Sequence, residues 1–242
     1  MNSNKGLEMG FLDHLEELRW RLVKCLISIC VGSIFSFNYI DEILRVLLLP
    51  TLETTIPVNI QVLSVQGMFI IKWFISFITG FIISLPILTY QLWQFISPGL
   101  KLNEKRYLFP VVFFSFSSFL VGISFGYFIL IPFSLEFFSS IGMGNIENNY
   151  SIQYYFSFLS WLLLGSGVIF QLPVVSLILS AIGLLTPAFM RHYRRHSIVS
   201  IFILSSFITP PDPVSMLIMA IPLIILYELS IGISWIINRN ET

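Results

Sequence analysis

Long apolar segments separated by short polar ones dominate this chain. Six apolar runs can be delimited, at residues 22–40, 67–94, 107–135, 156–179, 197–208 and 214–237. A helix needs roughly 20 apolar residues to cross a bilayer core of about 30 Å. All but the fifth run reach about that length, whereas residues 197–208 would extend only about 18 Å as a helix. The pattern predicts an all-α integral membrane protein with six transmembrane helices in a single domain over residues 1–242.

Prolines interrupt several of these runs. Pro86 predicts a kink or tilt in the second helix, and Pro110 and Pro132 interrupt the third. Residues 41–66 mix acids, prolines and short apolar pieces, which predicts a loop that can hold an interfacial helix. If the turn at residues 209–213 lies below the outer surface, the membrane must thin there or admit water.

The first run is preceded by a charged segment with helical periodicity. Phe11, Leu15, Leu18 and Leu22 form one apolar stripe, so residues 11–22 are predicted to be an amphipathic helix that enters the membrane. Its acids have a structural explanation. Asp13 and Glu16 have the spacing of a capping box, and Glu17 precedes Arg21 by four residues, as in a surface ion pair.

Composition agrees with a membrane protein. Hydrophobic residues make up 56% of the chain and charged residues 11%, which excludes an ordinary water-soluble domain. The 13 basic and 13 acidic residues cancel, so net charge gives no indication of a nucleic-acid partner. Cys25 and Cys30 lie inside one apolar run and are interpreted as small hydrophobic residues. The N-terminus lacks the features of a cleavable signal peptide, so the first run should remain as a span.

Basic residues alternate between loops. They cluster before the first run, between the second and third runs, between the fourth and fifth runs, and after the sixth run. Arg45 is the clearest exception. The positive-inside rule therefore places both termini and these two loops in the cytoplasm. The clustered residues are Lys5, Arg19, Arg21, Lys24, Lys101, Lys105, Arg106, Arg191, Arg194, Arg195 and Arg239.

Two carboxylates among these cations are candidates for ligand binding. Glu17 lies near Arg19 and Arg21, and Glu104 lies beside Lys105 and Arg106. Ionised carboxylates bind guanidinium groups bidentately, so two such acids on one face could hold a pair of arginines. Solvated ion pairs at helix ends are the alternative interpretation.

Polar residues inside the apolar runs are fewer. Glu228 is either a functional carboxylate or a position close enough to the cytoplasmic end to be hydrated. Gln171 is expected to form a hydrogen bond between helices. A competing hypothesis is a secondary transporter of ions or small molecules, with Lys72, Gln171, Asp212 and Glu228 along its pathway.

An enzyme is not indicated, because metalloprotease, serine-hydrolase and phosphate-loop motifs are absent and the three histidines lie outside the runs.

Motifs along the whole chain resemble those of the TatC family, the multi-spanning receptor of twin-arginine protein translocation. They are FLDHLEELR at 11–19, YQLWQFISPGL at 90–100 with EKR at 104–106, FQLP at 170–173, TPPD at 209–212, AIP at 220–222 and YE at 227–228. The resemblance implies six spans with both termini in the cytoplasm, a cup-like arrangement, short fifth and sixth helices, and no cofactor, metal or catalytic residue.

The resemblance also implies a site and partners. Glu17 and Glu104 match the acids that recognise the twin-arginine signal peptide of folded precursors, and Arg19 and Phe95 match neighbouring positions. Pro50 and Tyr127 match structural positions, and Asp212 and Glu228 match acids near the outer turn and in the last span.

The implied partners are single-span TatA/TatB-type subunits and further TatC copies, with transport driven by the proton gradient. The implied location is the bacterial cytoplasmic membrane, or alternatively a thylakoid or mitochondrial inner membrane. Gln171 departs from the family, which often has glutamate there, so a charge-dependent role at this position is in doubt.

Overall fold

The computed structural model describes residues 11–52, 58–96, 108–141, 148–181, 183–209 and 212–239. Helices make up nearly all of its regular structure. In chain order the elements are α1 (Phe11–Asn38), α2 (Ile40–Leu48), η1 (Leu49–Leu52), β1 (Val58–Gln61), α3 (Gly67–Ile96), α4 (Leu108–Phe125), η4 (Gly126–Leu130), α5 (Ile131–Ile141), β2 (Asn148–Ser151), α6 (Ile152–Ile169), α7 (Leu172–Ala181), α8 (Pro187–His192), α9 (Arg194–Ile208) and α10 (Pro213–Arg239).

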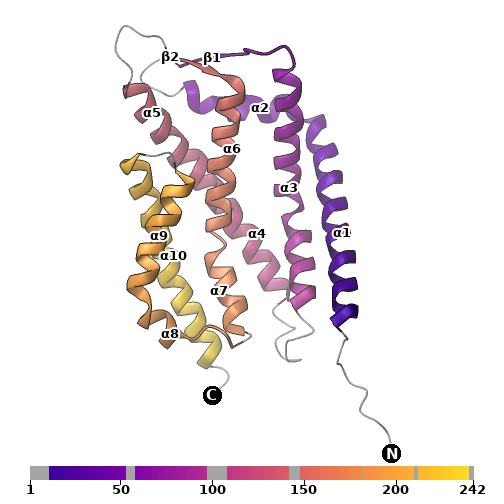
Figure 1. The fold of residues 1–242 in the computed structure, drawn as a ribbon, viewed down its shortest axis with the longest axis vertical. Helices are drawn as coiled ribbons and strands as arrows, with labels where there is room; N and C mark the ends of the chain where they lie inside the picture. Colours follow the sequence, from indigo (N-terminus) through magenta and orange to yellow (C-terminus); the bar gives the residue numbers. More distant parts are fainter. Residues whose placement is uncertain are drawn as a thin grey trace, which may run out of the picture.

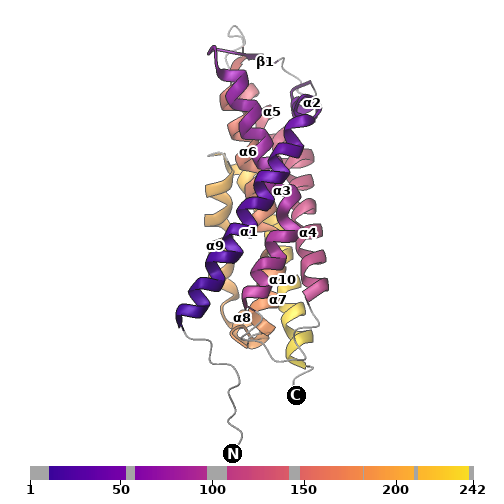
Figure 2. The ribbon, with the colours of Figure 1, turned by 90° about the vertical axis from the view of Figure 1, so that its right-hand side faces the viewer.

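The long helices form one elongated bundle (Figures 1 and 2). α1 begins and α10 ends at the same end, which also holds the end of α3 and the start of α4; we call it the terminal end. Elements α2, β1 and β2 lie at the other end, which we call the opposite end. The membrane side that each end faces stays a prediction.

Five helical segments in the described residues are long and apolar enough to cross a membrane, namely His14–Asn38, Gly67–Phe95, Val111–Ile141, Ile152–Ser180 and Pro213–Ile236. The fifth predicted run corresponds to α9, which has only 15 residues. The expectation of a short sixth helix is wrong, because α10 extends over 27 residues. The end of α9 and the start of α10 lie at a lower level than the end of α5 and the start of α6 (Figures 1 and 2).

Small residues bring α1 and α3 close together. A Cβ on Gly80 would lie 2.4 Å from the backbone nitrogen of Ser33, and one on Gly32 would lie 2.7 Å from the Gly80 carbonyl oxygen. At the same crossing the Ser84 hydroxyl donates to the Ser28 carbonyl over 2.8 Å. In lipid, where apolar side chains gain nothing by leaving the solvent, such close backbone packing is what holds helices together.

Prolines set the interruptions of the third and fourth spans. The π-helical turn η4 directly precedes Pro132 at the start of α5. Proline lacks the N–H that an α-helix uses, so the hydrogen bonding changes locally. In the same way α6 ends at Ile169, just before Pro173. This break frees the Phe170 carbonyl, which accepts a hydrogen bond from Ser118 of α4.

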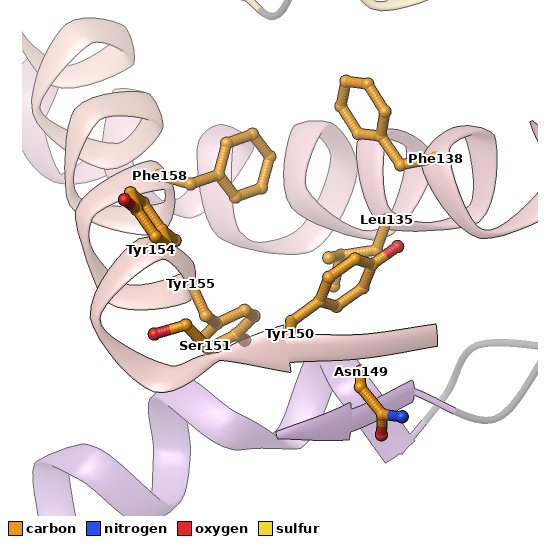
Figure 3. Close-up of a pocket in the computed structure, with 8 residues that line it drawn as sticks. All are labelled: Leu135, Phe138, Asn149, Tyr150, Ser151, Tyr154, Tyr155 and Phe158. Carbon is orange, nitrogen blue, oxygen red and sulfur yellow. The ribbon is translucent and has the colours of Figure 1, made fainter. Parts of the chain in front are cut away.

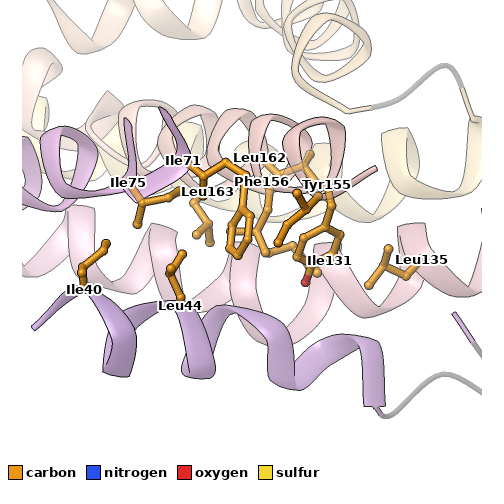
Figure 4. Packing of buried hydrophobic residues seen from close by; sticks show 12 residues of the cluster. Ile40, Leu44, Ile71, Ile75, Ile131, Leu135, Tyr155, Phe156, Leu162 and Leu163 are labelled. Atoms are coloured by element: carbon orange, nitrogen blue, oxygen red, sulfur yellow. The ribbon is translucent and has the colours of Figure 1, made fainter. Parts of the chain in front are cut away.

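The largest group of buried apolar side chains lies under α2 (Figure 4). Ile40 and Leu44 of α2 pack on side chains from α3, α5 and α6, among which Phe156 and Leu162 are almost fully buried. The segment 41–66 therefore contains a helix, α2, that covers the core at the opposite end, and its location at the membrane interface stays a prediction.

A two-stranded parallel sheet at the opposite end was not predicted. β1 pairs with β2, with Val58 opposite Asn148 and Gln61 opposite Ser151. The Gln61 side chain also donates to Asn149 over 3.1 Å. Each strand has only four residues. β1 alternates apolar and polar residues but is too short to stand out, and β2 has no apolar alternation by which a strand is recognised in a sequence.

Candidate functional site

Glu17 is held in place by Arg21 one helical turn later. The Nε of Arg21 donates to Oε1 of Glu17 over 2.9 Å, and its Nη2 donates to the same oxygen. The guanidinium also donates to the Gln91 side chain and to the Gln94 carbonyl of α3, each over 3.2 Å. The predicted surface pair is thus partly buried and joins two helices, with side-chain exposures of 21% for Glu17 and 17% for Arg21.

The second oxygen of Glu17 has a different environment. Oε2 is buried and has no hydrogen-bond partner within the part of the chain that the structure describes. His14 Nδ1 lies 3.7 Å away, which is too long for a hydrogen bond. The His14 ring stacks on Phe95 of α3, with centroids 4.3 Å apart and planes inclined by 14°. Glu17, His14 and Phe95 therefore form one cluster at the terminal end.

One predicted member of this site, Arg19, does not contact the cluster in the described residues. The Arg19 side chain is exposed, and its guanidinium carbon lies 5.9 Å from the centre of the Trp20 ring, away from the Glu17 hydrogen bonds. Glu104 lies outside the described residues. Sequence reasoning took Arg21 only as a surface partner and missed Gln91, because the contact between them joins residues 70 positions apart.

Gln171 lies at the break between α6 and α7 and contacts α4. Its Oε1 accepts from the Ser115 hydroxyl and its Nε2 donates to the Ser115 carbonyl, both over 2.8 Å. Ser115 Oγ lies 3.1 Å from Thr89 Oγ1 of α3, and because Ser115 already donates to Gln171, Thr89 is the donor here. The hydrogen bond between helices that the sequence predicts for Gln171 is present, and it extends to a third helix.

Asp212 caps α10. Its Oδ2 accepts the backbone N–H of Ser215 over 2.6 Å, and Pro213 occupies the first helical position, where proline is favoured. Asp212 is only 2% exposed, and its Oδ1 is buried with no hydrogen-bond partner among the residues described. The negative charge also suits the helix N-terminus. The sequence placed Asp212 near a turn but gave no sign of its burial.

Glu228 lies toward the terminal end of α10. Arg194 at the start of α9 donates through Nε to its Oε1 over 2.6 Å, and this hydrogen bond raises the pKa of Arg194 above its usual value. The Glu228 side chain is 40% exposed. Its role as a functional carboxylate or as a hydrated position near the cytoplasmic end stays a prediction. Neighbouring Tyr227 joins the same region by accepting from Ser197 and donating to the Met190 carbonyl.

Tyr127 contacts the end of α2, and Pro50 lies in the turn that follows it. The Tyr127 hydroxyl donates to the Val46 carbonyl over 2.6 Å, and Tyr155 of α6 donates to the next carbonyl, Leu47, over 2.7 Å. Pro50 is buried in η1 and has no N–H to donate to Val46, four residues earlier. The two tyrosines thus provide donors for carbonyl groups at the end of a helix that proline terminates.

The opposite end holds an ion pair and an aromatic pocket. Lys72 of α3 forms an ion pair with Asp41 of α2 over 2.7 Å. A pocket of about 320 Å³ lies between α5, β2 and α6, lined mainly by aromatic rings such as Tyr150, Tyr154 and Phe158 (Figure 3). Burial raises the pKa of Tyr150. Across the described ranges, no group of three His, Cys, Asp or Glu residues could hold a metal ion.

The fold and these contacts define a multi-spanning α-helical membrane protein whose polar side chains join helices or gather at the ends of the bundle. A family model described as "Sec-independent protein translocase protein (TatC)" matches residues 13–222. This chain belongs to the TatC family.

Relatives of similar length agree with this assignment. A protein named Sec-independent protein translocase protein TatC from Helicobacter pylori (strain ATCC 700392 / 26695) is 40% identical over 226 residues, which cover 93% of this chain and 87% of that protein. The protein of the same name from Desulforapulum autotrophicum is 37% identical, covering 91% and 82%. A crystal structure described as the twin arginine translocase receptor TatC superposes with a TM-score of 0.78 at 34% identity, covering 93% of this chain and 99% of that one.

Family membership decides between the hypotheses. The relatives are bacterial and the chain has several membrane-spanning helices, so it is a multi-pass protein of the bacterial cytoplasmic membrane. It is a protein translocase component and not an enzyme, and the hypothesis of a small-molecule transporter is not supported.

Proposed function

We propose that this chain is the receptor subunit of a twin-arginine translocase and binds the signal peptides of folded precursors at the terminal end of the bundle. In this proposal Glu17 accepts a signal arginine, Glu104 accepts the second, and Phe95 and Arg19 flank the site. No covalent chemistry is needed, because recognition and assembly are binding events.

The observation that carries this proposal is the hydrogen bonding of the Glu17 carboxylate, whose two oxygens have different surroundings. One oxygen is held by Arg21, which fixes the orientation of the group. The other oxygen has no hydrogen-bond partner in the described residues, and the ring of Phe95 lies nearby on the far side of His14. A carboxylate oxygen next to an aromatic ring suits a guanidinium, which donates hydrogen bonds in its plane and stacks through its face.

Charge also matters for this site. Arg21 balances the charge of Glu17, so a single incoming cation would meet a nearly neutral pair. A second acid is therefore needed to attract a dicationic motif, and Glu104 is the residue that the family resemblance offers. Long-range attraction of this kind is screened within about 8 Å at physiological ionic strength, so both acids must lie close to the ligand.

We further propose that single-span TatA/TatB-type subunits and other copies of this chain assemble around the spans. Gln171 would contribute to this surface without charge by holding α4 against the break between α6 and α7 through its hydrogen bonds to Ser115. The proton gradient would drive transport, and the signal's apolar stretch would insert along the bundle after its arginines are bound.

Site-specific photocrosslinking tests the receptor role. A photoreactive amino acid replaces Glu17, or Glu104 in a second variant, in membranes that contain a precursor with an Arg-Arg or a Lys-Lys signal. Adducts that form with Arg-Arg and fade with Lys-Lys support guanidinium-selective recognition. Equal adducts with the two precursors, or none with either, would return both acids to helix-end ion pairs. A probe at exposed Trp235, on α10, is the matched control and should give no signal-dependent adduct.

A further inference from the structure

His14 fills the space between Phe95 and the open oxygen of Glu17. Its imidazole is nearly parallel to the Phe95 ring, at 4.3 Å between centroids, and its Nδ1 points to within 3.7 Å of Glu17 Oε2. The Oε2 atom is buried although its side chain is partly exposed, and nothing in the described ranges donates a hydrogen bond to it.

The two contacts of this imidazole are those that a guanidinium would make. Both groups are flat, both stack on an aromatic face, and both can present an N–H to a carboxylate. The ammonium of lysine has no flat face and can make only the second contact. The position of the His14 ring therefore marks where the guanidinium of a ligand fits.

We propose that His14 is an internal placeholder that occupies the arginine position of the receptor site and must move out before a signal arginine enters. This inference rests on the proposed function, because it takes arginine as the ligand and Glu17 as its acceptor. His14 is a specificity-determining residue in this scheme. When its ring leaves the site, only a ligand that contacts both Phe95 and Glu17 compensates for the two contacts that are lost.

The surroundings allow such an exchange. The His14 side chain is 43% exposed, so it can rotate into solvent without crossing the packed interior. Arg21 keeps its hydrogen bonds to Glu17, Gln91 and Gln94 throughout, so the acceptor stays in place while the ring leaves. At 3.7 Å His14 makes no hydrogen bond to Oε2, whereas a guanidinium at ordinary hydrogen-bond distance would donate to it.

Occupancy by His14 lowers the apparent affinity for the ligand. A protein whose site is open for only a fraction of the time binds more weakly by that fraction. Aromatic pairs of this type shift such an equilibrium by about two- to tenfold. Removal of the ring should therefore tighten signal binding by about the same factor, although it deletes a residue from the site.

Equilibrium binding to the full-length protein in lipid nanodiscs tests the inference. A fluorescent synthetic peptide with a twin-arginine motif is titrated against the wild type, His14→Ala and His14→Phe. We expect His14→Ala to bind about two- to tenfold more tightly. His14→Phe keeps a ring on Phe95, so its affinity should equal or fall below that of the wild type. His196→Ala, which removes an exposed histidine from the start of α9, should leave the affinity unchanged.

Glu17→Gln and a twin-lysine peptide separate the two proposals. If the wild type prefers twin arginine and Glu17→Gln loses that preference, the receptor site stands. The placeholder is then overturned if His14→Ala binds as the wild type does or more weakly, or if His14→Phe tightens binding as much as His14→Ala. If the wild type does not distinguish the two peptides, it is the proposed function that fails.

Discussion

Arg21 of α1 donates a hydrogen bond to Gln91 of α3 over 3.2 Å while the same guanidinium holds Glu17. The start of the first helix is thereby fixed to the end of the third, and the orientation of the Glu17 carboxylate depends on both. A contact that the sequence suggests to be a local ion pair is a connection between helices.

Replacement of Arg21 should weaken both the fold and the site. Arg21→Gln leaves the Glu17 carboxylate partly buried without its counter-ion, which we expect to destabilise the protein by about 1–2 kcal/mol, less than for a fully buried pair. The midpoint of thermal unfolding in detergent measures this. Adding Glu17→Gln to Arg21→Gln should recover part of the loss, because the uncompensated charge is removed. A double variant less stable than Arg21→Gln would contradict this account.

Introducing the acid common in the family at Gln171 should make stability depend on pH. In Gln171→Glu a carboxylate would face the Ser115 carbonyl, which now accepts from the amide, and two acceptors repel. Only the protonated acid can donate, so the folded state favours the protonated form of the new residue. The variant should match the wild type most closely at low pH and lose stability as pH rises. Unfolding midpoints at pH 5 and pH 8 test this, with Gln171→Leu as a variant without pH dependence.

The cap on α10 predicts different effects for two substitutions at Asp212. Asp212→Ala removes the acceptor for the Ser215 N–H and should cost about 1 kcal/mol. Asp212→Asn keeps an oxygen acceptor and should retain most of the stability. Thermal unfolding of the two variants in parallel is the measurement. If Asp212→Asn is stable yet inactive in export, the charge has a role beyond capping.

The tyrosine hydroxyls at the end of α2 should control the exposure of that helix. Tyr127→Phe deletes one of two donors to the Val46 carbonyl, which also accepts from the Leu49 N–H, and it keeps the ring. This should cost about 1 kcal/mol. Amide hydrogen exchange should then become faster in α2 and η1 but not in α10. Tyr154→Phe is the control, since its side chain is 79% exposed at the same end. Equal acceleration in both variants would argue against a specific role for Tyr127.

The crossing of α1 and α3 should not tolerate a methyl group. Gly80→Ala would bring a Cβ to 2.4 Å from a backbone atom of α1, so the helices must separate, and we expect a loss of about 1–3 kcal/mol. Gly232→Ala in α10 is the matched control, because a Cβ there meets nothing within 4 Å. It should be neutral or slightly stabilising through helix propensity. Unfolding midpoints that fall equally in both variants would exclude the packing explanation.

The sequence alone determined the features that depend on neighbours along the chain. Apolar run length predicted the spans, Pro132 predicted an interruption of the third, and the spacing of Glu17 and Arg21 predicted their pairing. Each follows from local geometry, since helical periodicity and the missing proline N–H act within a few residues.

Only the tertiary structure decided what lies opposite those residues. The contact of Arg21 with Gln91, the stacking of His14 on Phe95 and the pairing of Glu228 with Arg194 join distant positions. Burial of Asp212 likewise depends on how α9 and α10 pack, which no local pattern encodes. The composition of a helix shows which residues it contains, whereas its rotation and its partners are set by packing against the other helices of the bundle.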